Sequence, residues 1–275
     1  MSAGISITSL INDSKEILPL SDIYCLLTNV LGKKKEFLYS HPEYALSPDE
    51  TKRWQEYKSR RLEGEPCAYI IGYQEFFSLL FKVNKYTMIP RPETELLVEE
   101  VMRLKPASLL DVGTGCGNIA VTLKYHNKQC AVIAVDISED ALLVARENAG
   151  SLLGENNITF IESDYFTNVP AQAFDVIVSN PPYVISEEIS TLQKEIREYE
   201  PLIALDGGGD GLDAYRLIIG KGRQFLKEGG RLVLEIDKRL IDGISSLALK
   251  NSYIIKKTVC DLSGRERMMV LETKS

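Results

Sequence analysis

The tetrapeptide Asn180-Pro181-Pro182-Tyr183 carries the most specific chemistry in this chain. It joins a side-chain amide, two residues that lack a backbone N–H and an aromatic ring, directly after the apolar run 174–179. Such a set offers hydrogen-bond acceptors and a flat face with few competing donors, which suits a planar amide or amine nitrogen. The same residues also suit a stiff turn that leaves a sheet, so the tetrapeptide alone leaves both interpretations open.

A glycine-rich loop follows an earlier apolar run, residues 108–112. Its members are Gly113, Thr114, Gly115, Cys116 and Gly117. Glycines here let the backbone turn tightly and approach a ligand closely. The dinucleotide fingerprint GxGxxG would need glycine where this chain has Asn118. Asp111, two residues before the first glycine, would repel phosphate but suits a ligand with an amino group and a positive sulfonium, such as S-adenosylmethionine.

Acids stand at two further predicted strand ends. Asp136 ends the apolar run 131–136, and Asp164 and Tyr165 follow the run 158–162. Ligands of a parallel sheet bind outside the carboxyl ends of its strands, so these side chains are expected at one edge. We predict that Asp136 accepts hydrogen bonds from both ribose hydroxyls, that Asp164 takes the adenine amino group, and that Tyr165 packs on the adenine ring. With the glycine loop, they predict a site for an adenosine-containing ligand.

Strands and helices must alternate to bring these residues together, and the sequence from residue 93 onward has that rhythm. We predict strands at 108–112, 131–136, 158–162, 174–179, 231–236, 252–258 and 267–272. We predict helices at 93–104, 117–127, 139–150, 189–197, 211–227 and 239–249. This alternation is typical of an α/β fold, a doubly wound and largely parallel sheet with helices on both faces.

The sequence before residue 93 has a different character. Residues 1–75 read as short helices, with apolar residues at helical spacing after Ser21. Ser47 and Pro48, followed by acids, open a helix that we expect to continue to Leu62.

A β-hairpin is predicted next. The aromatic-rich segment 75–83 and the segment 86–89 read as two strands on either side of the turn Asn84-Lys85. We therefore expect a helical domain at 1–75, a β-hairpin linker at 76–92 and an α/β domain at 93–275.

Charge restricts the partners. The net charge is −7; residues 1–85 carry 11 Lys/Arg and 11 Asp/Glu, whereas residues 86–275 carry 21 and 28. A sequence-independent grip on nucleic acid needs a basic face, so no direct nucleic-acid partner is expected. No run approaches the ~18 apolar residues that span a bilayer, so no membrane partner is expected either.

Metal and histidine chemistry find little support in the sequence. The five cysteines include no CxxC pair, and the two histidines, His41 and His126, have no partner nearby in sequence. We therefore expect no disulfide frame, no metal and no histidine base. The first residues lack a basic segment followed by an apolar one, so we expect no secretory signal and a cytoplasmic location.

At these motifs the chain resembles a known group of enzymes. The glycine loop, Asp136 and the tetrapeptide are similar to those of class I S-adenosylmethionine-dependent methyltransferases that act on amino or amide nitrogens. Further stretches narrow the resemblance to the peptide chain release factor N5-glutamine methyltransferases. These stretches are Gly64-Glu65-Pro66, Ala68-Tyr69, Gly72, Glu75-Phe76, Ile89 to Glu95, Glu200-Pro201, Ala204-Leu205 and Asp261 to Arg265. The resemblance covers nearly the whole chain and is weakest over residues 1–50.

The resemblance implies a Rossmann-like class I methyltransferase sheet, joined by a hairpin to a small all-helical N-terminal domain that recognises the substrate. The methyl group of S-adenosyl-L-methionine would pass to the side-chain amide nitrogen, N5, of the glutamine in the Gly-Gly-Gln motif of class I peptide chain release factors. The product would be S-adenosyl-L-homocysteine, and the modification would modulate translation termination.

The resemblance also assigns residues. It places Gly113 to Gly117 around the methionine part of the cofactor, Asp136 at the ribose and Tyr165 against adenine. It places Asn180, Pro181, Pro182 and Tyr183 at the substrate glutamine, with Asn180 also near the cofactor. Two positions depart from the family pattern, because many relatives have tryptophan in place of Tyr165 and glycine in place of Asp237.

For the reaction we hypothesise that the Asn180 side-chain oxygen and the Pro181 carbonyl accept the two protons of the substrate amide, while Tyr183 packs against it. The same tetrapeptide serves enzymes that methylate exocyclic amines of adenine or guanine, which is the alternative function. A non-catalytic chaperone or binding module is a third interpretation. The acidic catalytic region argues against the former, and the intact tetrapeptide and glycine loop argue against the latter.

Overall fold

The structure of the protein, a computed structural model, describes residues 5–154 and 158–274. The chain forms two compact units. The helical unit takes its described residues from 1–72 and 193–199, and the sheet unit takes its described residues from 73–192 and 200–275. The chain therefore passes between the units three times, and a short segment after the tetrapeptide belongs to the helical unit although both of its flanks belong to the sheet unit.

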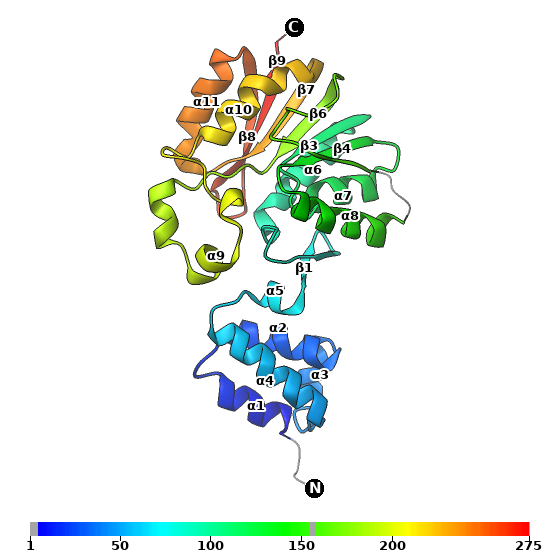
Figure 1. Ribbon diagram of the computed structural model, residues 1–275, viewed down its shortest axis with the longest axis vertical. Helices are drawn as coiled ribbons and strands as arrows, with labels where there is room; N and C mark the ends of the chain where they lie inside the picture. Colours follow the sequence, from blue (N-terminus) through cyan, green and yellow to red (C-terminus); the bar gives the residue numbers. More distant parts are fainter. Residues whose placement is uncertain (1–4, 155–157, 275) are drawn as a thin grey trace. The chain divides into compact units, whose positions relative to one another are not determined.

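Short helices make up the N-terminal part of the helical unit, as predicted (Figure 1). They are α1 (Ile7–Ser14), α2 (Leu20–Leu31), α3 (Lys35–Ser40), α4 (Pro48–Leu62) and α5 (Cys67–Ile71). The predicted limits of α4 are confirmed: Ser47 caps it, and Glu50 completes a capping box in which each side chain binds the other residue's backbone N–H. Ile23, Leu26 and Trp54 are fully buried in the core of this unit.

The segment 193–199 contains α9 (Lys194–Tyr199) and is held to α4 by polar contacts. Arg61 forms ion pairs with Asp22 of α2 and with Glu195 of α9. The hydroxyl of Tyr199 donates to the carbonyl oxygen of Glu63 at 3.3 Å. The prediction of one helix over 189–197 is wrong, because a 3₁₀ helix, η2 (Ser186–Thr191), and α9 occupy this stretch as separate elements.

The sheet unit is built on a seven-stranded sheet in the order β5-β4-β3-β6-β7-β9-β8. Its strands are β3 (Ser108–Val112), β4 (Ala131–Asp136), β5 (Ile158–Glu162), β6 (Phe174–Ser179), β7 (Leu226–Glu235), β8 (Tyr253–Cys260) and β9 (Glu266–Thr273). Strands β3 to β7 pair in parallel, and β9 runs antiparallel to both β7 and β8. The predicted doubly wound, largely parallel sheet is confirmed.

Helices cover both faces of this sheet (Figure 1). The helices are α6 (Glu95–Leu104), α7 (Asn118–His126), α8 (Glu139–Leu153), α10 (Asp213–Gly222) and α11 (Ile241–Lys250). Helices α10 and α11 bury Ile218, Ile219 and Ile244 against the sheet on one side, while α6, α7 and α8 line up on the other. Short 3₁₀ helices complete the unit: η1 (Pro92–Thr94), η3 (Leu202–Ala204), η4 (Arg223–Phe225) and η5 (Lys238–Leu240).

The predicted helix over 211–227 is shorter in the structure. Helix α10 ends at Gly222, η4 follows, and β7 begins at Leu226, earlier than predicted. Asp237, which departs from the family pattern, has an ordinary φ of −90°, and its side chain caps η5 by accepting the N–H of Arg239. The turn after β7 therefore does not require glycine.

The predicted hairpin is wrong in its position. The strands are β1 (Tyr73–Phe76) and β2 (Leu79–Lys82), and they pair antiparallel around the turn Phe77-Ser78. Both turn residues have positive φ, 51° and 60°, which two-residue hairpin turns favour but which Asn and Gly adopt far more readily. Residues 86–89 are not a strand, because the Asn84 side chain accepts the N–H of Tyr86 and turns the chain there.

Candidate active site

A cavity of about 270 Å³ lies at the carboxyl ends of β3, β4 and β6 in the sheet unit. Most of the predicted site residues line it: Gly113, Thr114, Gly115, Cys116, Asp136, Asp164, Tyr165, Asn180, Pro181 and Pro182. Gly117 and Tyr183 are not among its lining residues. Its size is near the lower end of small-molecule pockets, which hold ~300–1,000 Å³.

Two glycines of the loop 113–117, Gly113 and Gly115, leave open space where a side chain would stand. The N–H groups of Gly113 and Thr114 both donate to the carbonyl oxygen of Val135 at 2.9 Å, which holds the loop against the end of β4. Gly115 has a φ of +56°, and a Cβ built on it would meet no heavy atom within 4 Å. Gly117 differs, because its Cβ would lie 3.1 Å from the Cβ of Ala145 in α8. Gly117 thus serves the packing of α7 on α8.

Asp111 lies beneath the loop and does not line the cavity. Its Oδ2 accepts hydrogen bonds from the Thr114 hydroxyl at 2.7 Å and from the backbone N–H of Ala120 at 3.2 Å. Burial raises the pKa of its carboxyl to about 7. The expectation that this acid faces the ligand is wrong, since the structure uses it to fix the loop and the first turn of α7.

Asp136 joins the glycine loop to the end of β4. Its Oδ2 accepts the N–H of Gly115 at 2.8 Å, and its Oδ1 accepts the N–H of Ser138 at 3.0 Å. Burial raises the pKa of this carboxyl. Each oxygen keeps a second lone pair, so the side chain can still accept hydrogen bonds from a ligand's hydroxyls. Its contact with a ribose stays a prediction.

The two predicted adenine residues both line the cavity. Asp164 is exposed, and Tyr165 is half-buried with a positive φ of 49°. Burial raises the pKa of the Tyr165 hydroxyl, and its ring packs on the hydrophobic core of the sheet. The structure thus presents one exposed carboxylate and one fixed ring to the cavity.

Asn180 is held by two residues that sequence reasoning missed. Its Nδ2 donates to Thr94 Oγ1 at 3.2 Å, and Thr94 Oγ1 donates to Glu235 Oε2 at 2.7 Å. Both partners are almost completely buried, at 1% and 4% exposed. The register of β6 on β7 pairs Ser179 with Leu234, so the next residues, Asn180 and Glu235, leave adjacent strand ends together. A buried acid at the end of an apolar strand was the available signal.

The remaining walls of the cavity were also missed. Two further segments, within residues 86–90 and 201–204, contribute to them, as do residues of α7 and of the start of α8. Glu200 ties these segments together, because its carboxylate accepts the N–H of Ile89 at 3.2 Å and pairs with Arg91 at 2.5 Å. The Glu200 side chain is 1% exposed, so this connection is an interior one.

Tyr183 lies against a second glycine-rich loop, residues 207–211. A Cβ on Gly207 would lie 2.8 Å from the Cα of Tyr183, and a Cβ on Gly211 would lie 2.8 Å from its carbonyl oxygen. The N–H of Gly207 donates to the carbonyl oxygen of Val184 at 2.8 Å. The Tyr183 ring packs on the core, and burial raises the pKa of its hydroxyl. Its contact with a substrate amide stays a prediction.

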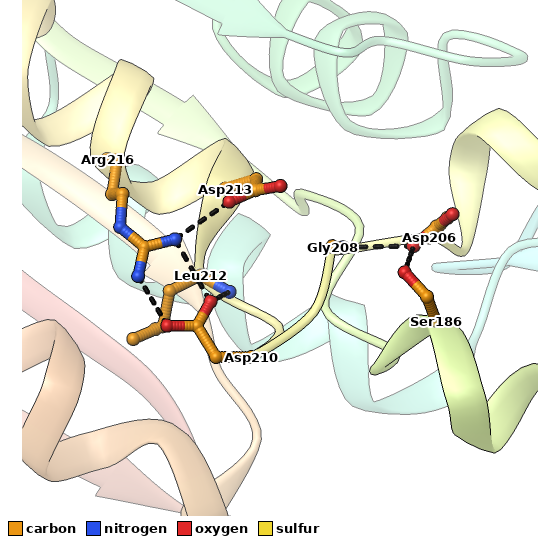
Figure 2. A network of polar contacts seen from close by, with 7 residues as sticks. All are labelled: Ser186, Asp206, Gly208, Asp210, Leu212, Asp213 and Arg216. Atoms are coloured by element: carbon orange, nitrogen blue, oxygen red, sulfur yellow. Dashed lines mark hydrogen bonds and ion pairs between the residues drawn. The ribbon is translucent and has the colours of Figure 1, made fainter.

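Polar contacts fix this second loop at both ends (Figure 2). Asp206 accepts the hydroxyl of Ser186 at 2.7 Å and the N–H of Gly208 at 2.9 Å. Arg216 of α10 pairs with Asp210 and, at 2.7 Å, with Asp213. The loop behind Tyr183 is therefore anchored to the residues after the tetrapeptide and to α10.

Two absences hold for the part of the chain that the structure describes. Across residues 5–154 and 158–274, no helix is long and apolar enough to cross a membrane. In the same ranges, no group of three or more His, Cys, Asp and Glu side chains is arranged to hold a metal ion.

Comparison with known proteins identifies the two parts of the chain. Residues 92–200 match the methyltransferase small domain, and residues 7–72 match the PrmC N-terminal domain. The chain is 35% identical to a release factor glutamine methyltransferase of Caulobacter vibrioides, over 92% of this chain and 89% of that one. It is 36% identical to a bifunctional methyltransferase of Rickettsia felis over 89% of this chain, and it spans about half of that longer protein, 52%.

Among solved structures, the protein is similar in fold to a methyltransferase from Pyrococcus furiosus, with a TM-score of 0.55 at 16% identity, over 83% of this chain and 100% of that one. The sheet, the flanking helices and the cavity at the carboxyl edge of the sheet define a class I methyltransferase. Within this class, the chain belongs to the release factor glutamine methyltransferase family, because its identity to the Caulobacter protein extends over most of both chains. The resemblance seen in the sequence is confirmed.

Proposed function

We propose that this protein transfers a methyl group from S-adenosyl-L-methionine to the side-chain amide nitrogen, N5, of the glutamine in the Gly-Gly-Gln motif of class I peptide chain release factors. The orientation of the Asn180 side chain is the main support for this proposal. Its amide nitrogen donates a hydrogen bond to Thr94, which leaves Oδ1 as an acceptor at the cavity. Beside it, the Pro181 carbonyl oxygen accepts no hydrogen bond from any described residue. Two neighbouring acceptors suit the two N–H groups of a primary amide. The similarity to release factor glutamine methyltransferases supports a glutamine side chain of a release factor as that amide.

The cavity has the features that the methyl donor needs. When bound, S-adenosylmethionine supplies a methyl group on a positively charged sulfur, and S-adenosyl-L-homocysteine is what remains after transfer. The bare faces of Gly113 and Gly115 leave room for its methionine part. Asp136 would accept the ribose hydroxyls, and Asp164 and Tyr165 would hold the adenine.

The residues of the tetrapeptide prepare the nitrogen for attack. An amide nitrogen is a poor nucleophile because its lone pair is delocalised into the carbonyl. Asn180 Oδ1 and the Pro181 carbonyl oxygen would accept hydrogen bonds from the two N–H groups of the substrate amide. These hydrogen bonds would fix the orientation of the nitrogen and raise its electron density. The new N–C bond would form from the nitrogen lone pair as the bond between the methyl carbon and sulfur breaks and leaves its electron pair on sulfur, and one of the amide protons would leave to water. Alignment of well-oriented reactants is worth ~7–11 kcal/mol, so positioning can supply much of the rate.

Recognition of the release factor is assigned to the helical unit. Its residues 7–72 match a domain found at the N-terminus of related enzymes, and its segment 193–199 comes between the tetrapeptide and the cavity wall at 201–204 in the chain. Methylation of release factors would place the protein in translation termination.

The direct test is to incubate the protein with labelled S-adenosylmethionine and a full-length release factor, and to locate the methyl group by mass spectrometry. We expect it on the glutamine of the Gly-Gly-Gln motif, and none on a release factor that has glutamate there. Parallel reactions contain DNA and RNA oligonucleotides. Methyl transfer to an adenine or guanine amine, with none to the protein, would refute the proposal and favour the alternative function.

Asn180→Ala tests the mechanism. We expect kcat to fall about 10²-fold or more, because loss of one positioned transition-state partner typically has that effect. Binding of S-adenosylhomocysteine, measured by calorimetry, should be retained. Transfer within a few fold of the wild type, with the cofactor bound normally, would show that the side-chain amide is not the orienting group.

A further inference from the structure

Thr94, which also lines the cavity, joins Asn180 to Glu235, and the mechanism above uses only the orientation of Asn180 that results. The three side chains form a chain of hydrogen bonds, from Asn180 Nδ2 to Thr94 Oγ1 at 3.2 Å and from Thr94 Oγ1 to Glu235 Oε2 at 2.7 Å. We propose that Thr94 and Glu235 are positioning residues that set which end of the Asn180 amide faces the substrate. This inference rests on the proposed function and deepens it.

The number of protons available fixes the direction of these hydrogen bonds. An ionised carboxylate can only accept hydrogen bonds, so the Thr94 hydroxyl uses its single proton to donate a hydrogen bond to Glu235. The Thr94 oxygen then has only lone pairs to offer, and the NH₂ end of Asn180 must turn toward it. The oxygen end is consequently turned toward the cavity. A side-chain amide that lacked this partner could rotate by half a turn and present NH₂ to a substrate that itself presents NH₂.

The use of Thr94 is not explained by the helix it begins. Thr94 is the last residue of η1 and leads into α6 with helical dihedral angles, φ −65° and ψ −18°, whereas a threonine that caps a helix has an extended backbone. Here the side chain makes no capping hydrogen bond. The hydroxyl is engaged by Glu235 and Asn180 instead, so its place in the structure serves the site rather than the helix end.

The burial of Glu235 also lacks a structural reason. A buried carboxylate is destabilising unless it is paired, and no described Lys or Arg side chain forms an ion pair with Glu235. The positive charges that act on it belong to Arg267, which pairs with Asp261 and Glu93, and to Arg91, which pairs with Glu200. An acid kept in this position therefore agrees with a role that needs an acceptor.

The charge of Glu235 makes the arrangement sensitive to pH. Burial, with a smaller contribution from Glu93, raises the pKa of Glu235 to about 7, against the lowering effect of Thr94, Arg267 and Arg91. The Tyr215 hydroxyl faces the backbone carbonyl of Glu235 rather than its carboxyl. Above this pKa the carboxylate accepts a hydrogen bond from the Thr94 hydroxyl. Below it the neutral acid can donate a hydrogen bond to Thr94, and the direction of the hydrogen bonds from Asn180 to Glu235 is no longer fixed.

The experiment compares Thr94→Val, Thr94→Ser and Glu235→Gln, with Thr122→Val as the matched control. Thr122 is also completely buried, and its hydroxyl has no hydrogen-bond partner among the described residues, so this variant makes the same chemical change away from the site. The readouts are kcat and KM for a release factor between pH 5.5 and 8.5, roughly the range in which a carboxyl of raised pKa titrates. S-adenosylhomocysteine affinity and thermal unfolding are measured alongside.

We expect Thr94→Val to lower kcat by about 10- to 100-fold with KM and cofactor affinity unchanged, since a buried donor and acceptor lose their partner. Thr94→Ser should restore most of the activity, and Thr122→Val should match the wild type. The wild-type kcat should fall as the pH drops below about 7, and Glu235→Gln should be impaired and lack this fall.

Three results would overturn the inference: wild-type kcat in Thr94→Val, an equal loss in Thr94→Val and Thr94→Ser, or an unchanged acid limb in Glu235→Gln. Loss of cofactor affinity in parallel with kcat would assign Thr94 a merely structural role and would also overturn it. Failure of the wild type to methylate any glutamine is a separate result, because it refutes the proposed function itself.

Discussion

Two glycines, Gly115 in the loop 113–117 after β3 and Gly207 in the loop 207–211 before α10, are needed for opposite reasons. Gly115 has a φ of +56°, and a Cβ on it would meet no heavy atom within 4 Å. Gly207 has no φ in the left-handed region, but its Cβ would lie 2.8 Å and 2.9 Å from the Cα and carbonyl carbon of Tyr183. Backbone conformation requires the first glycine, and lack of space requires the second.

The two glycines leave space for different occupants. The space beside Gly115 belongs to the cavity, so it is open to a ligand that is not part of the chain. The space beside Gly207 is filled by the backbone of Tyr183, the last residue of the tetrapeptide. Side chains added to the first loop should therefore affect cofactor binding, and those added to the second should affect the transfer step.

Gly207→Ala should have the largest effect. The added methyl group cannot fit unless the Tyr183 backbone moves, and overpacking of this kind costs about 1–3 kcal/mol of folding stability. A displacement near 1 Å of an orienting group can lower a rate by ~10²-fold. We expect kcat to fall by about that factor, measured with a saturating release factor, while S-adenosylhomocysteine affinity stays within about twofold of the wild type.

If Gly207→Ala weakened cofactor binding as much as methyl transfer, the two loops would not have separate roles. That result would mean that the two loops act on one shared element. Thermal unfolding of the same variant shows whether it is folded at the assay temperature. Both cases can then be told apart from global destabilisation, because an unfolded protein would not bind the cofactor.

Gly115→Ala should have a smaller and different effect. Alanine in the left-handed region is strained by roughly 1–2 kcal/mol, and its methyl group would enter the cavity beside Asp136. We expect S-adenosylhomocysteine to bind about tenfold more weakly by calorimetry, the equivalent of about 1.4 kcal/mol. At saturating cofactor kcat should recover to near the wild-type value, and a persistent loss would contradict the assignment of this loop to binding.

Much of the sheet could be predicted because buried parallel strands are continuous apolar runs. Strands β3, β4, β5 and β6 begin and end where the sequence predicted. The hairpin could not, since its turn at Phe77-Ser78 contains neither glycine nor asparagine. The turn is supported from a distance: the Glu95 carboxylate accepts the N–H of Phe77 at 2.8 Å, and no local pattern reveals such a contact.

The site divides in the same way. The tetrapeptide and the first glycine loop are contiguous, so their residue types alone revealed them. Thr94 and Glu235 are separated by 141 positions and become neighbours only through the packing of η1 against the end of β7. We assigned Asp111 to the ligand because it is close to the glycine loop in sequence. Residue type alone does not tell whether a side chain at the end of a strand faces the cavity or lies beneath the loop.

Gly209→Ala should have the smallest effect of the three substitutions. Gly209 lies in the same loop as Gly207, yet it has no φ in the left-handed region and a Cβ on it would meet nothing within 4 Å. Neither conformation nor space requires glycine there, so kcat should match the wild type. Reduced freedom of the unfolded chain should raise the free energy of unfolding by about 0.4–1 kcal/mol, measured by urea denaturation. If Gly209→Ala instead lost activity as Gly207→Ala does, then mobility of the loop, and not the space beside Tyr183, would be what transfer requires.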